Sequence, residues 1–333
     1  MNARKITEKI ERFAFSSRAV FSSETLGRSR FEPPCDLRTE FQRDRDRIIH
    51  SKGFRRLKRK TQVFVAPVGD HFRTRLTHTL EVSQIARTAA RALRVNEDLV
   101  EAISLGHDLG HTSFGHAGER SLNLVCPLGF RHYEQSVRLI EKLEKDGKGL
   151  NLTEEVKDGI LCHTGGRWAK TFEGRLVRVC DKIAYINHDI DDAIRAEKIK
   201  FEEIPQNFIK IVGTKYSQRL DTMISSVVNG SSLDTPCMEP ELQIAFDEVH
   251  QFMHSEVYSK LKSSEEHNVN FLIESLYIYF MKNVHRLPPE NQAVANSDGP
   301  DRAVCDYIAG MTDDFAIATF SNIFIPKSFN LGL

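Results

Sequence analysis

A stretch of thirteen residues holds the densest group of titratable side chains in the chain. Residues 107–119 read His-Asp-Leu-Gly-His-Thr-Ser-Phe-Gly-His-Ala-Gly-Glu, with three imidazoles and two carboxylates. Such a density is typical of a metal site or an acid–base centre. His107 and Asp108 end a predicted helix in which Val100 and Ile103 share a face with His107, by the i, i+3, i+7 rule. A lone inward His would be a hydrogen-bonded core residue, but this one has titratable neighbours.

Two further helical segments supply partners for this pair. In residues 75–89, His78 stands at the head of an apolar stripe that continues through Val82, Ile85 and Ala89. The spacing is that of one helix face, so His78 is predicted to enter a buried surface.

The second segment, residues 181–192, has an apolar stripe of isoleucines and a separate polar face. The polar face carries Asp181, Tyr185, His188, Asp189 and Asp192, at helical spacing. A solvated surface is the alternative interpretation. Solvated faces usually mix in Lys and Glu, whereas this one carries Tyr and His, which favours a functional face.

Four of these residues form a candidate ligand set: His78, His107, Asp108 and Asp181. A His, an adjacent His-Asp pair and a distant Asp are the layout of the HD superfamily of metal-dependent phosphohydrolases. Two neutral imidazoles and two carboxylates suit manganese, iron, cobalt, nickel or zinc without singling one out. We therefore predict one divalent transition metal per chain.

A closer resemblance covers residues 35–200. The segments 43–64, 75–82, 107–119 and 181–193 resemble the dGTPase family of deoxynucleoside triphosphate triphosphohydrolases. Two positions depart from that family: Ser113 stands where Pro is usual, and Tyr133 where Asn is expected. The first departure should cost only loop rigidity. The second lies in a segment that is close to the phosphates in relatives, so it bears on substrate preference.

The resemblance implies hydrolysis of deoxynucleoside triphosphates to deoxynucleoside and triphosphate, by water attack at the α-phosphorus. It also implies roles for three residues outside the ligand set. His116 and Glu119 match the catalytic His and its acidic partner, and a carboxylate-held His can act as acid or base near neutral pH. Taken alone, Glu119 would be an acid at a helix start. His111 is assigned to phosphate contact.

Substrate contacts follow by motif position. The resemblance assigns Gln62 to the deoxyribose. Arg75, Lys182 and Tyr185 are candidate phosphate donors, and Asp189 is a candidate acceptor for a sugar hydroxyl. Magnesium can accompany the triphosphate. Relatives assemble as homo-oligomers, so we expect one here.

Whole-chain properties bound the class of protein. The chain has 333 residues, is 40% hydrophobic and 28% charged, and has a formal net charge of +0. This balance argues against a dedicated nucleic-acid-coating protein. No apolar run reaches membrane-spanning length, and the N-terminus lacks the apolar core of a signal peptide. Six cysteines without CxxC spacing indicate reduced thiols in the cytoplasm.

The predicted fold is all-α: an HD-domain helical bundle with additional C-terminal helices and at most a small β-hairpin, over residues 61–70. We divide the chain into an N-terminal arm (1–34), the HD metal-dependent phosphohydrolase core (35–200) and a C-terminal helical region packed on the core (201–333). The arm either packs on the body or another subunit, or is a loosely ordered tail.

In the C-terminal region, amphipathic spacing predicts helices over 208–228, 241–261, 269–284 and 301–312, with a polar loop at 293–300. The strongly basic segment 39–60 either forms a solvated face or meets an anion, which would be triphosphate or single-stranded nucleic acid. We favour phosphate and subunit contacts.

Three functions are left open. The first is a dNTP triphosphohydrolase. The second is another HD phosphohydrolase, such as a nucleotidase or phosphodiesterase, which the arginine-rich lead-in disfavours. The third is a weakly active regulator that binds nucleotide or single-stranded DNA, which the complete ligand set disfavours because binding alone needs no activated water.

Overall fold

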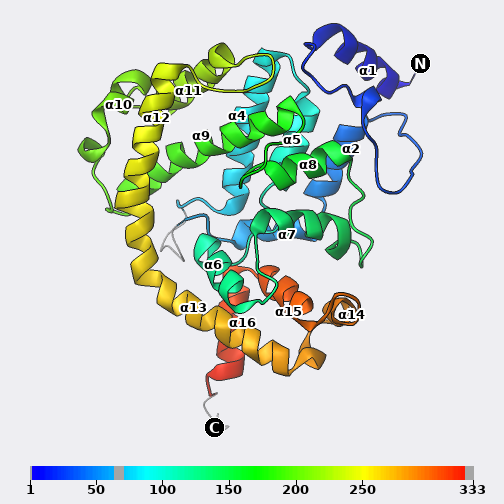
Figure 1. The fold of residues 1–333 in the computed structure, drawn as a ribbon, viewed down its shortest axis with the longest axis vertical. Coiled ribbons are helices and arrows are strands. Elements are labelled where there is room, and N and C mark those ends of the chain that lie inside the picture. Colours follow the sequence, from blue (N-terminus) through cyan, green and yellow to red (C-terminus); the bar gives the residue numbers. More distant parts are fainter. Residues whose placement is uncertain (1, 64–70, 327–333) are drawn as a thin grey trace, which may run out of the picture.

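A computed structural model describes residues 2–63 and 71–326 of the chain (Figure 1). Over those residues the regular structure is helical, and β-pairing is limited to two isolated bridges, Arg28–Thr153 and Thr61–Thr74. The all-α prediction is confirmed. The predicted hairpin falls largely on residues 64–70, outside the described part. No helix of the described residues is both long and apolar enough to cross a membrane.

The N-terminal half supplies nine α-helices. They are α1 (Ala3–Ala14), α2 (Glu40–Ile49), α3 (Lys52–Arg56), α4 (Arg75–Leu93), α5 (Glu97–Gly106), α6 (Gly115–Val125), α7 (His132–Arg138), α8 (Glu154–Cys162) and α9 (Phe172–Arg195). A π-helical turn, Leu139–Leu143, extends α7.

The remaining helices form the C-terminal half. They are α10 (Gln206–Val212), α11 (Tyr216–Gly230), α12 (Pro240–Met253), α13 (Ser259–Lys282), α14 (Pro289–Asp298), α15 (Pro300–Ala309) and α16 (Asp313–Phe324). In Figure 1, α12 and α13 follow one another along the side of the molecule, and α14–α16 lie beyond α6 and α7.

The central helices α4, α5 and α9 pack on one another, with α8 against both α5 and α9. The predicted stripe on α4 is buried there, since Val82 and Ile85 are fully covered. Two glycines let α5 and α8 approach closely. A Cβ on Gly159 would lie 2.4 Å from Ile103 Cδ1, and one on Gly106 would lie 2.5 Å from Ile160 Cδ1. Only glycine fits at both contacts.

A second apolar cluster joins α6 to the C-terminal helices. Leu122 of α6 lies in it with Ile273 and Leu276 of α13 and with Val304 and Ile308 of α15. Helix α6, which follows the His-Asp motif, therefore packs in the cluster with α13 and α15. Its buried Leu122 is not part of the first apolar cluster, around α4, α5 and α9. The residue boundaries of the predicted regions stay predictions.

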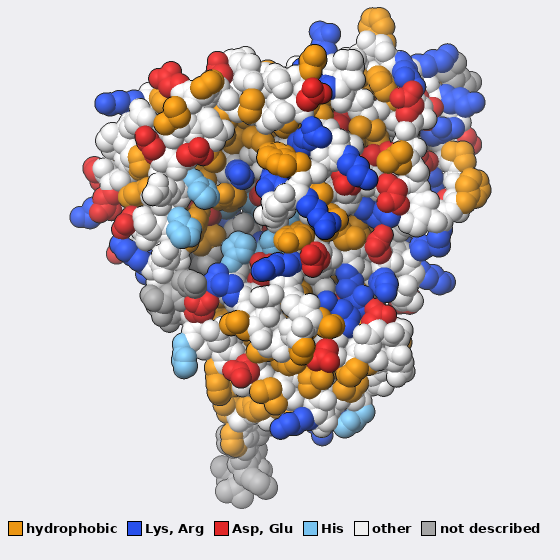
Figure 2. All heavy atoms as spheres, viewed as in Figure 1, with side chains coloured by type: hydrophobic (Ala, Val, Ile, Leu, Met, Phe, Trp, Pro, Cys, Tyr) orange, Lys and Arg blue, Asp and Glu red, His pale blue; other side chains and the backbone are white. Residues whose placement is uncertain are grey.

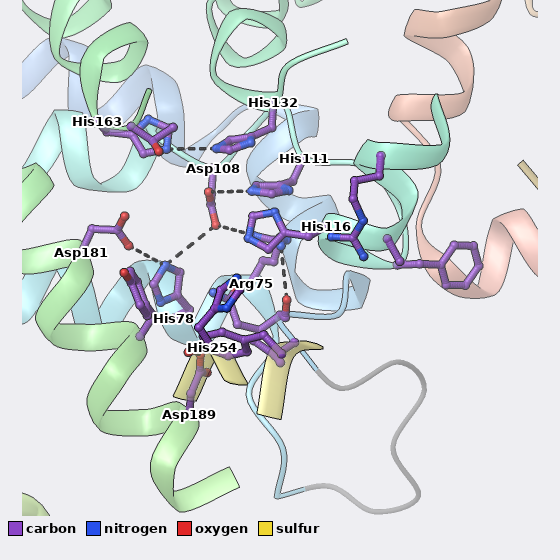
Figure 3. A pocket seen from close by; sticks show the side chains of 18 of the residues that line it. Arg75, His78, Asp108, His111, His116, His132, His163, Asp181, Asp189 and His254 are labelled. Atoms are coloured by element: carbon purple, nitrogen blue, oxygen red, sulfur yellow. Dashed lines mark hydrogen bonds and ion pairs between the residues drawn. The ribbon is translucent and has the colours of Figure 1, made fainter. Parts of the chain in front are cut away.

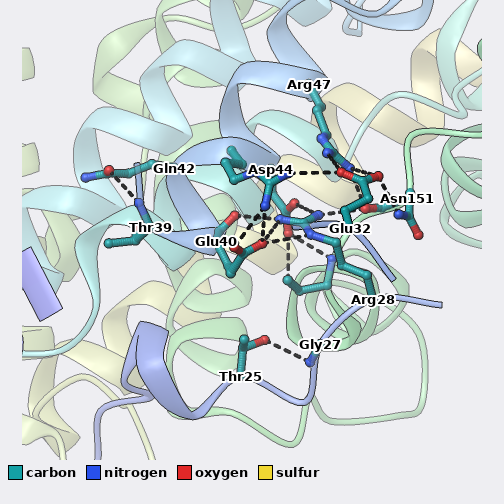
Figure 4. Close-up of polar contacts among 12 residues, drawn as sticks. Thr25, Gly27, Arg28, Glu32, Thr39, Glu40, Gln42, Asp44, Arg47 and Asn151 are labelled. Carbon is teal, nitrogen blue, oxygen red and sulfur yellow. Dashed lines mark hydrogen bonds and ion pairs between the residues drawn. The ribbon is translucent and has the colours of Figure 1, made fainter. Parts of the chain in front are cut away.

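The N-terminal arm packs on the body through buried polar contacts (Figure 4). The Arg28 guanidinium pairs with Glu40 at 2.7 Å and with the fully buried Asp44, and donates to the Asn151 carbonyl at 2.6 Å. Asp44 also accepts from the Thr153 hydroxyl, at 2.7 Å. Each buried charge has an opposite charge or a hydrogen bond beside it, as burial requires.

Part of the basic segment is paired within the chain. Arg43 pairs with Glu32 and Glu40, and Arg47 also pairs with Glu32. Lys60 is buried, and its amino group donates to the carbonyls of His111 and Ala309. These three side chains are therefore engaged by internal contacts, and an anion contact by the rest of the segment stays a prediction.

Three predicted helix boundaries are wrong, each for a local reason. The helix expected over 208–228 is two helices, because Gly213 has φ +88° and ends α10. The break expected between the helices 241–261 and 269–284 is absent, because α13 runs without interruption from Ser259 to Lys282; the π-helical turn His254–Tyr258 lies inside the first predicted helix instead. The polar loop expected at 293–300 is mostly α14, which starts at a proline and ends before Gly299.

Candidate active site and metal centre

The largest concentration of histidines lines a cavity of about 400 Å³ between the two halves of the fold. Figure 2 shows histidine side chains gathered at a hollow in the surface. Helices α4, α6, α7 and α9 supply one side of the cavity, and α12 with the turn that follows it supplies the other.

The four predicted metal ligands come together: His78, Asp108 and Asp181 line the cavity (Figure 3), and His107 lies directly behind them. His78 Nε2 lies 3.1 Å from Asp181 Oδ1, and His107 Nε2 lies 3.5 Å from Asp108 Oδ1 and 3.9 Å from Asp181 Oδ1. His78 Nε2 is 3.9 Å from Asp108 Oδ2. The atoms come from α4, the end of α5 and α9, as the helical phases predicted.

Each imidazole is oriented by its other ring nitrogen. His107 Nδ1 donates to the Ser104 carbonyl at 2.6 Å, so its Nε2 is unprotonated in the neutral ring. That Nε2 is buried and has no hydrogen-bond partner. His78 Nδ1 lies 2.9 Å from His188 Nε2, which turns His78 Nε2 toward Asp181. Metal-binding histidines are typically held in this way.

The two carboxylates are ionised at neutral pH. Burial alone would raise the pKa of Asp181, but the His78 hydrogen bond and the nearby His107 lower it to about 2. Burial likewise opposes ionisation of Asp108, and His107, His111 and Arg75 together hold its pKa well below the usual value. Two carboxylates beside a buried imidazole nitrogen without a partner fit a divalent metal ion. Donor atoms of His78, His107 and Asp108 all lie within 4.8 Å of one another, and Asp181 Oδ1 is 3.1 Å from His78 Nε2.

The predicted catalytic pair is also brought together. His116 Nδ1 lies 3.3 Å from Glu119 Oε2, both at the start of α6. The His116 side chain is 62% exposed, whereas Glu119 is buried. Glu119 accepts from the ring Nδ1 and the backbone N–H of His132, each at 2.9 Å. Burial opposes ionisation of Glu119, but the hydrogen bonds from His116 and His132 hold its pKa well below the ordinary value.

A strained turn sets the position of this pair. Phe114, just before α6, has φ +60°, a left-handed conformation that costs energy for an aromatic residue. Its backbone N–H donates to Asp313 Oδ1 at 2.9 Å. Gly115 follows with φ +55°, and a Cβ there would lie 2.9 Å from the Gln62 carbonyl oxygen. The C-terminal half thus holds the turn that aims His116 at the cavity.

Of the predicted substrate residues, Gln62, Arg75, Tyr185 and Asp189 line the cavity and Lys182 does not. Lys182 is exposed on α9. Burial is the main cause that lowers the pKa of His250, and the charge of Lys182 lowers it further. Its phosphate contact stays a prediction.

Two of the cavity residues already have partners in the chain. Arg75 Nη1 donates to Asp108 Oδ2 at 2.7 Å. Asp189 Oδ2 accepts from the Tyr258 hydroxyl at 2.7 Å. A substrate contact by Arg75 or Asp189 would therefore use a side chain that already makes an internal contact.

His111 lies beside the ligand Asp108, and Tyr133, one of the two positions that depart from the family pattern, lies beside His132. His111 Nε2 is 3.4 Å from Asp108 Oδ1, and its ring stacks on His132 with centroids 3.9 Å apart. Burial first, and then Arg75, lower the pKa of His111, so its imidazole is neutral. Ser113 is fully buried, and the Tyr133 ring meets the His132 ring edge to face at 5.6 Å.

The sequence did not indicate several residues that line the cavity, among them His132, His163, His254 and Tyr258. His163 had a usable signal, because it directly follows an inward-facing helix, as His107 does. His254 and Tyr258 come from the π-helical turn after α12, where helical phase changes. Counting along an ideal helix cannot place them.

The fold and the site together define an HD-domain phosphohydrolase. The HD domain model matches residues 75–186, and the phosphohydrolase-associated domain model matches residues 237–322. HD domains bind divalent metals. The chain belongs to the deoxyguanosinetriphosphate triphosphohydrolase-like family of HD-domain proteins.

Relatives of the same name span nearly the whole chain. The one from Caldanaerobacter subterraneus subsp. tengcongensis is 55% identical over 98% of this chain and 97% of its own length. The one from Clostridium perfringens strain 13 is 48% identical over 98% of this chain and 99% of its own. A crystal structure of a phosphohydrolase from Bacteroides thetaiotaomicron shares the fold, with a TM-score of 0.53, 19% identity, and coverage of 83% of this chain and 68% of that one.

Proposed function

We propose that the protein hydrolyses deoxynucleoside triphosphates to deoxynucleoside and triphosphate by water attack at the α-phosphorus. The observation that carries the proposal is one cavity lined by His116 and by His78, Asp108 and Asp181 of the candidate ligand set, with His107 and Glu119 held directly behind them. The names of its relatives support the same substrate class.

His78, His107, Asp108 and Asp181 would hold the divalent ion. When bound, it would polarise a phosphoryl oxygen and lower the pKa of a water molecule. These side chains are already fixed by Ser104, His188 and Arg75, so little reordering is needed to bind the ion.

His116 is the group that would move a proton at its free Nε2. Its Nδ1 faces the ionised Glu119, which orients the ring and stabilises an imidazolium. Because His116 is the more exposed of the two, its ring can reach a substrate in the cavity. Glu119 touches the chemistry only through His116 and His132, so it is a positioning residue.

The part of the cavity between α9 and the turn after α12 is suited to a nucleoside. Tyr185, Asp189 and Tyr258 present hydroxyl and carboxylate groups beside the metal ligands, and Gln62 approaches from the segment before α4. Burial raises the pKa of Tyr185, so its hydroxyl keeps its proton and can donate to the sugar or the phosphates.

Product analysis tests the proposal. Purified protein is mixed with each dNTP and Mn²⁺, and the products are separated by ion-exchange chromatography. Deoxynucleoside with intact tripolyphosphate is expected. Release of orthophosphate or pyrophosphate, or preferential hydrolysis of dAMP or cyclic dinucleotides, would favour another HD phosphohydrolase. Nucleotide binding without turnover under any metal would favour a binding regulator.

Selectivity for the sugar is expected as well. If Gln62, Tyr185 and Asp189 surround the deoxyribose, dATP should be hydrolysed faster than ATP under matched conditions, because a 2′-hydroxyl would need extra space and a partner. Equal rates on the two nucleotides would remove the sugar-contact assignments and leave the metal site untouched.

A further inference from the structure

A chain of four side chains joins the C-terminal half of the fold to the candidate metal ligand His78. His78 Nδ1 lies 2.9 Å from His188 Nε2. His188 Nδ1 lies 2.8 Å from Asp189 Oδ1, and Asp189 Oδ2 accepts from the Tyr258 hydroxyl at 2.7 Å. His78 and Asp189 lie on the same side of the cavity (Figure 3). We call these four residues the Tyr258–His78 chain.

The members of this chain come from three elements that are far apart in the sequence. His78 lies near the start of α4, and His188 and Asp189 are adjacent on α9. Tyr258 is the last residue of the π-helical turn after α12. His78, His188 and Asp189 are 2%, 0% and 2% exposed. Because water has so little access to these three side chains, it cannot replace a partner that is lost, and a change at one member alters the contacts of the next.

A bound ion would fix the order of the protons along the chain. An ion at His78 Nε2 needs the lone pair of that nitrogen, so the ring proton of His78 must be on Nδ1. This Nδ1 then donates to His188 Nε2, which leaves the proton of His188 on Nδ1, the nitrogen beside Asp189. The order follows from the ion, whatever the protonation of His188 before binding. Asp189 and Tyr258 therefore complete the support of a metal-bound His78.

The other candidate imidazole ligand is held in a different way. His107 Nδ1 donates to the carbonyl of Ser104, in the helix that His107 itself follows. His78 instead relies on side chains of α9 and of the turn after α12. The orientation of one ligand thus depends on one helix, whereas that of the other depends on how the two halves of the fold pack together.

We propose that His188, Asp189 and Tyr258 are positioning residues for the metal ligand His78, and that Tyr258 makes tight metal binding depend on the C-terminal half. The proposal rests on the proposed function only in taking His78 as a metal ligand. A partner behind a ligating histidine fixes the ring and raises its basicity. Asp189 also lines the cavity, so a nucleoside that contacts it would act on the same chain. The ion and the nucleoside would then change each other's affinity by the same factor.

The affinity of the full-length protein for Mn²⁺, measured without nucleotide, tests the proposal. Metal-free protein is titrated with Mn²⁺, and the free ion is followed by electron paramagnetic resonance. His188→Leu should weaken binding by roughly 10–100-fold, the usual effect of removing the partner of a ligating histidine. His188→Gln should recover part of this loss, because its side-chain oxygen can accept from His78 Nδ1. Tyr258→Phe removes only the hydroxyl at the far end and should weaken binding by about 3- to 10-fold, a coupling typical of one hydrogen-bond network.

A double variant distinguishes one connected chain from two independent effects. In the His188→Leu background, Tyr258→Phe should cause no further loss of affinity, because the connection to His78 is already broken. Additive losses would overturn the proposal. Tyr277→Phe is the matched control, since its hydroxyl donates to Asp301 at the same distance of 2.7 Å, in the second apolar cluster. This control should bind Mn²⁺ as the wild type does.

A spectroscopic readout separates positioning from general loss of stability. At saturating Co²⁺, the visible absorption bands report the ligands of the ion. The bands should shift in His188→Leu and in Tyr258→Phe and stay unchanged in Tyr277→Phe. If His188→Leu does not fold, as judged by its thermal transition, Tyr258→Phe and Asp189→Asn decide the matter, and both should weaken Mn²⁺ binding.

Mn²⁺ binding by Tyr258→Phe within about twofold of the wild type would overturn the proposal, whatever the effect of His188→Leu. Failure of the proposed function looks different. Weakened Mn²⁺ binding in the variants, with no hydrolysis of any dNTP by the wild type, would keep the chain and remove the substrate assignment. Hydrolysis to tripolyphosphate by the wild type, with unchanged Mn²⁺ affinity in the variants, would do the reverse.

Discussion

His107 and His163 hold the same position at the ends of two adjacent helices, and their rings meet with centroids 4.9 Å apart. Each residue directly follows the last residue of its helix, α5 or α8. Each Nδ1 donates to the carbonyl three residues earlier, at 2.6 Å from Ser104 and 2.7 Å from Ile160. In the neutral rings both Nε2 atoms are therefore unprotonated, and that of His163 lies 3.2 Å from His132 Nε2.

The close approach of α5 and α8 should be sensitive to a single methyl group. Gly159→Ala would place a Cβ 2.4 Å from Ile103 and push the helices apart. We expect about 1–3 kcal/mol of destabilisation, the usual cost of overpacking, together with weaker metal retention. Thermal unfolding and metal analysis measure the two effects. Gly166→Ala is the matched control, since no atom lies within 4 Å of its added Cβ. Equal stability of the two variants would contradict the packing argument.

Asp181→Ala should lose metal and turnover together. The substitution removes the carboxylate that lies 3.1 Å from His78 and 3.9 Å from His107, so the four-ligand site loses one of its two negative charges. We expect about one ion fewer per chain than in the wild type, measured after purification without chelator. Metal content equal to that of the wild type would count heavily against Asp181 as a ligand.

His116→Ala should separate chemistry from binding. His116 lies outside the candidate ligand set, so metal content and nucleotide affinity should stay close to those of the wild type. Turnover should fall by roughly two to four orders of magnitude, the usual contribution of a general acid or base. Single-turnover kinetics, metal analysis and melting temperature on the same preparation measure all three. If turnover per folded molecule is nearly normal, the proton-transfer role is wrong.

Glu119→Gln is expected to have a wider effect than orientation of His116 alone. Glu119 also accepts from the ring and backbone of His132, so the amide would leave His132 without its carboxylate. We expect a loss of turnover and, in addition, a lower melting temperature, because the amide cannot accept the His132 ring N–H at both oxygens. A variant that loses turnover at an unchanged melting temperature would restrict Glu119 to the His116 contact.

Stability should depend on pH through Glu173 of α9. Burial raises the pKa of this carboxyl to about 7, partly offset by hydrogen bonds from the Asn96 and Val20 backbones. A carboxyl with a raised folded-state pKa favours the fold when it is protonated. The stabilisation is therefore complete below about pH 4.5, its unfolded value, and is lost as the pH rises through 7.

Glu173→Gln removes that titration. Titration of Glu173 should make the free energy of unfolding of the wild type on the order of 3 kcal/mol larger at pH 5 than at pH 8. The variant should lack this difference. Urea unfolding at both pH values measures it. Glu154→Gln serves as a control, because Glu154 is a partly exposed carboxylate of α8 that pairs with Lys157 at 2.6 Å. An unchanged pH difference in Glu173→Gln would exclude this carboxyl as the cause.

Periodicity alone determined the all-α class and the inward direction of His78 and His107, each of which shares a face with apolar residues of its own helix. The ligand set, with Asp181 from a polar face, and the His116–Glu119 pair were predicted with the help of the family resemblance. The structure places His116 Nδ1 3.3 Å from Glu119 Oε2 and His78 Nε2 3.1 Å from Asp181 Oδ1, and their roles stay predictions.

Tertiary structure alone decided which groups complete the cavity. His132 and His163 are 31 positions apart and meet because glycines let α5 and α8 pack closely, bringing the end of α8 beside α7. Lys182 directly follows the ligand Asp181, yet it is exposed, because adjacent helical residues are about 100° apart and only the neighbouring helices decide which of them is covered. A sequence pattern assigns a residue to a face of its own helix. The packing of other helices determines what that face meets.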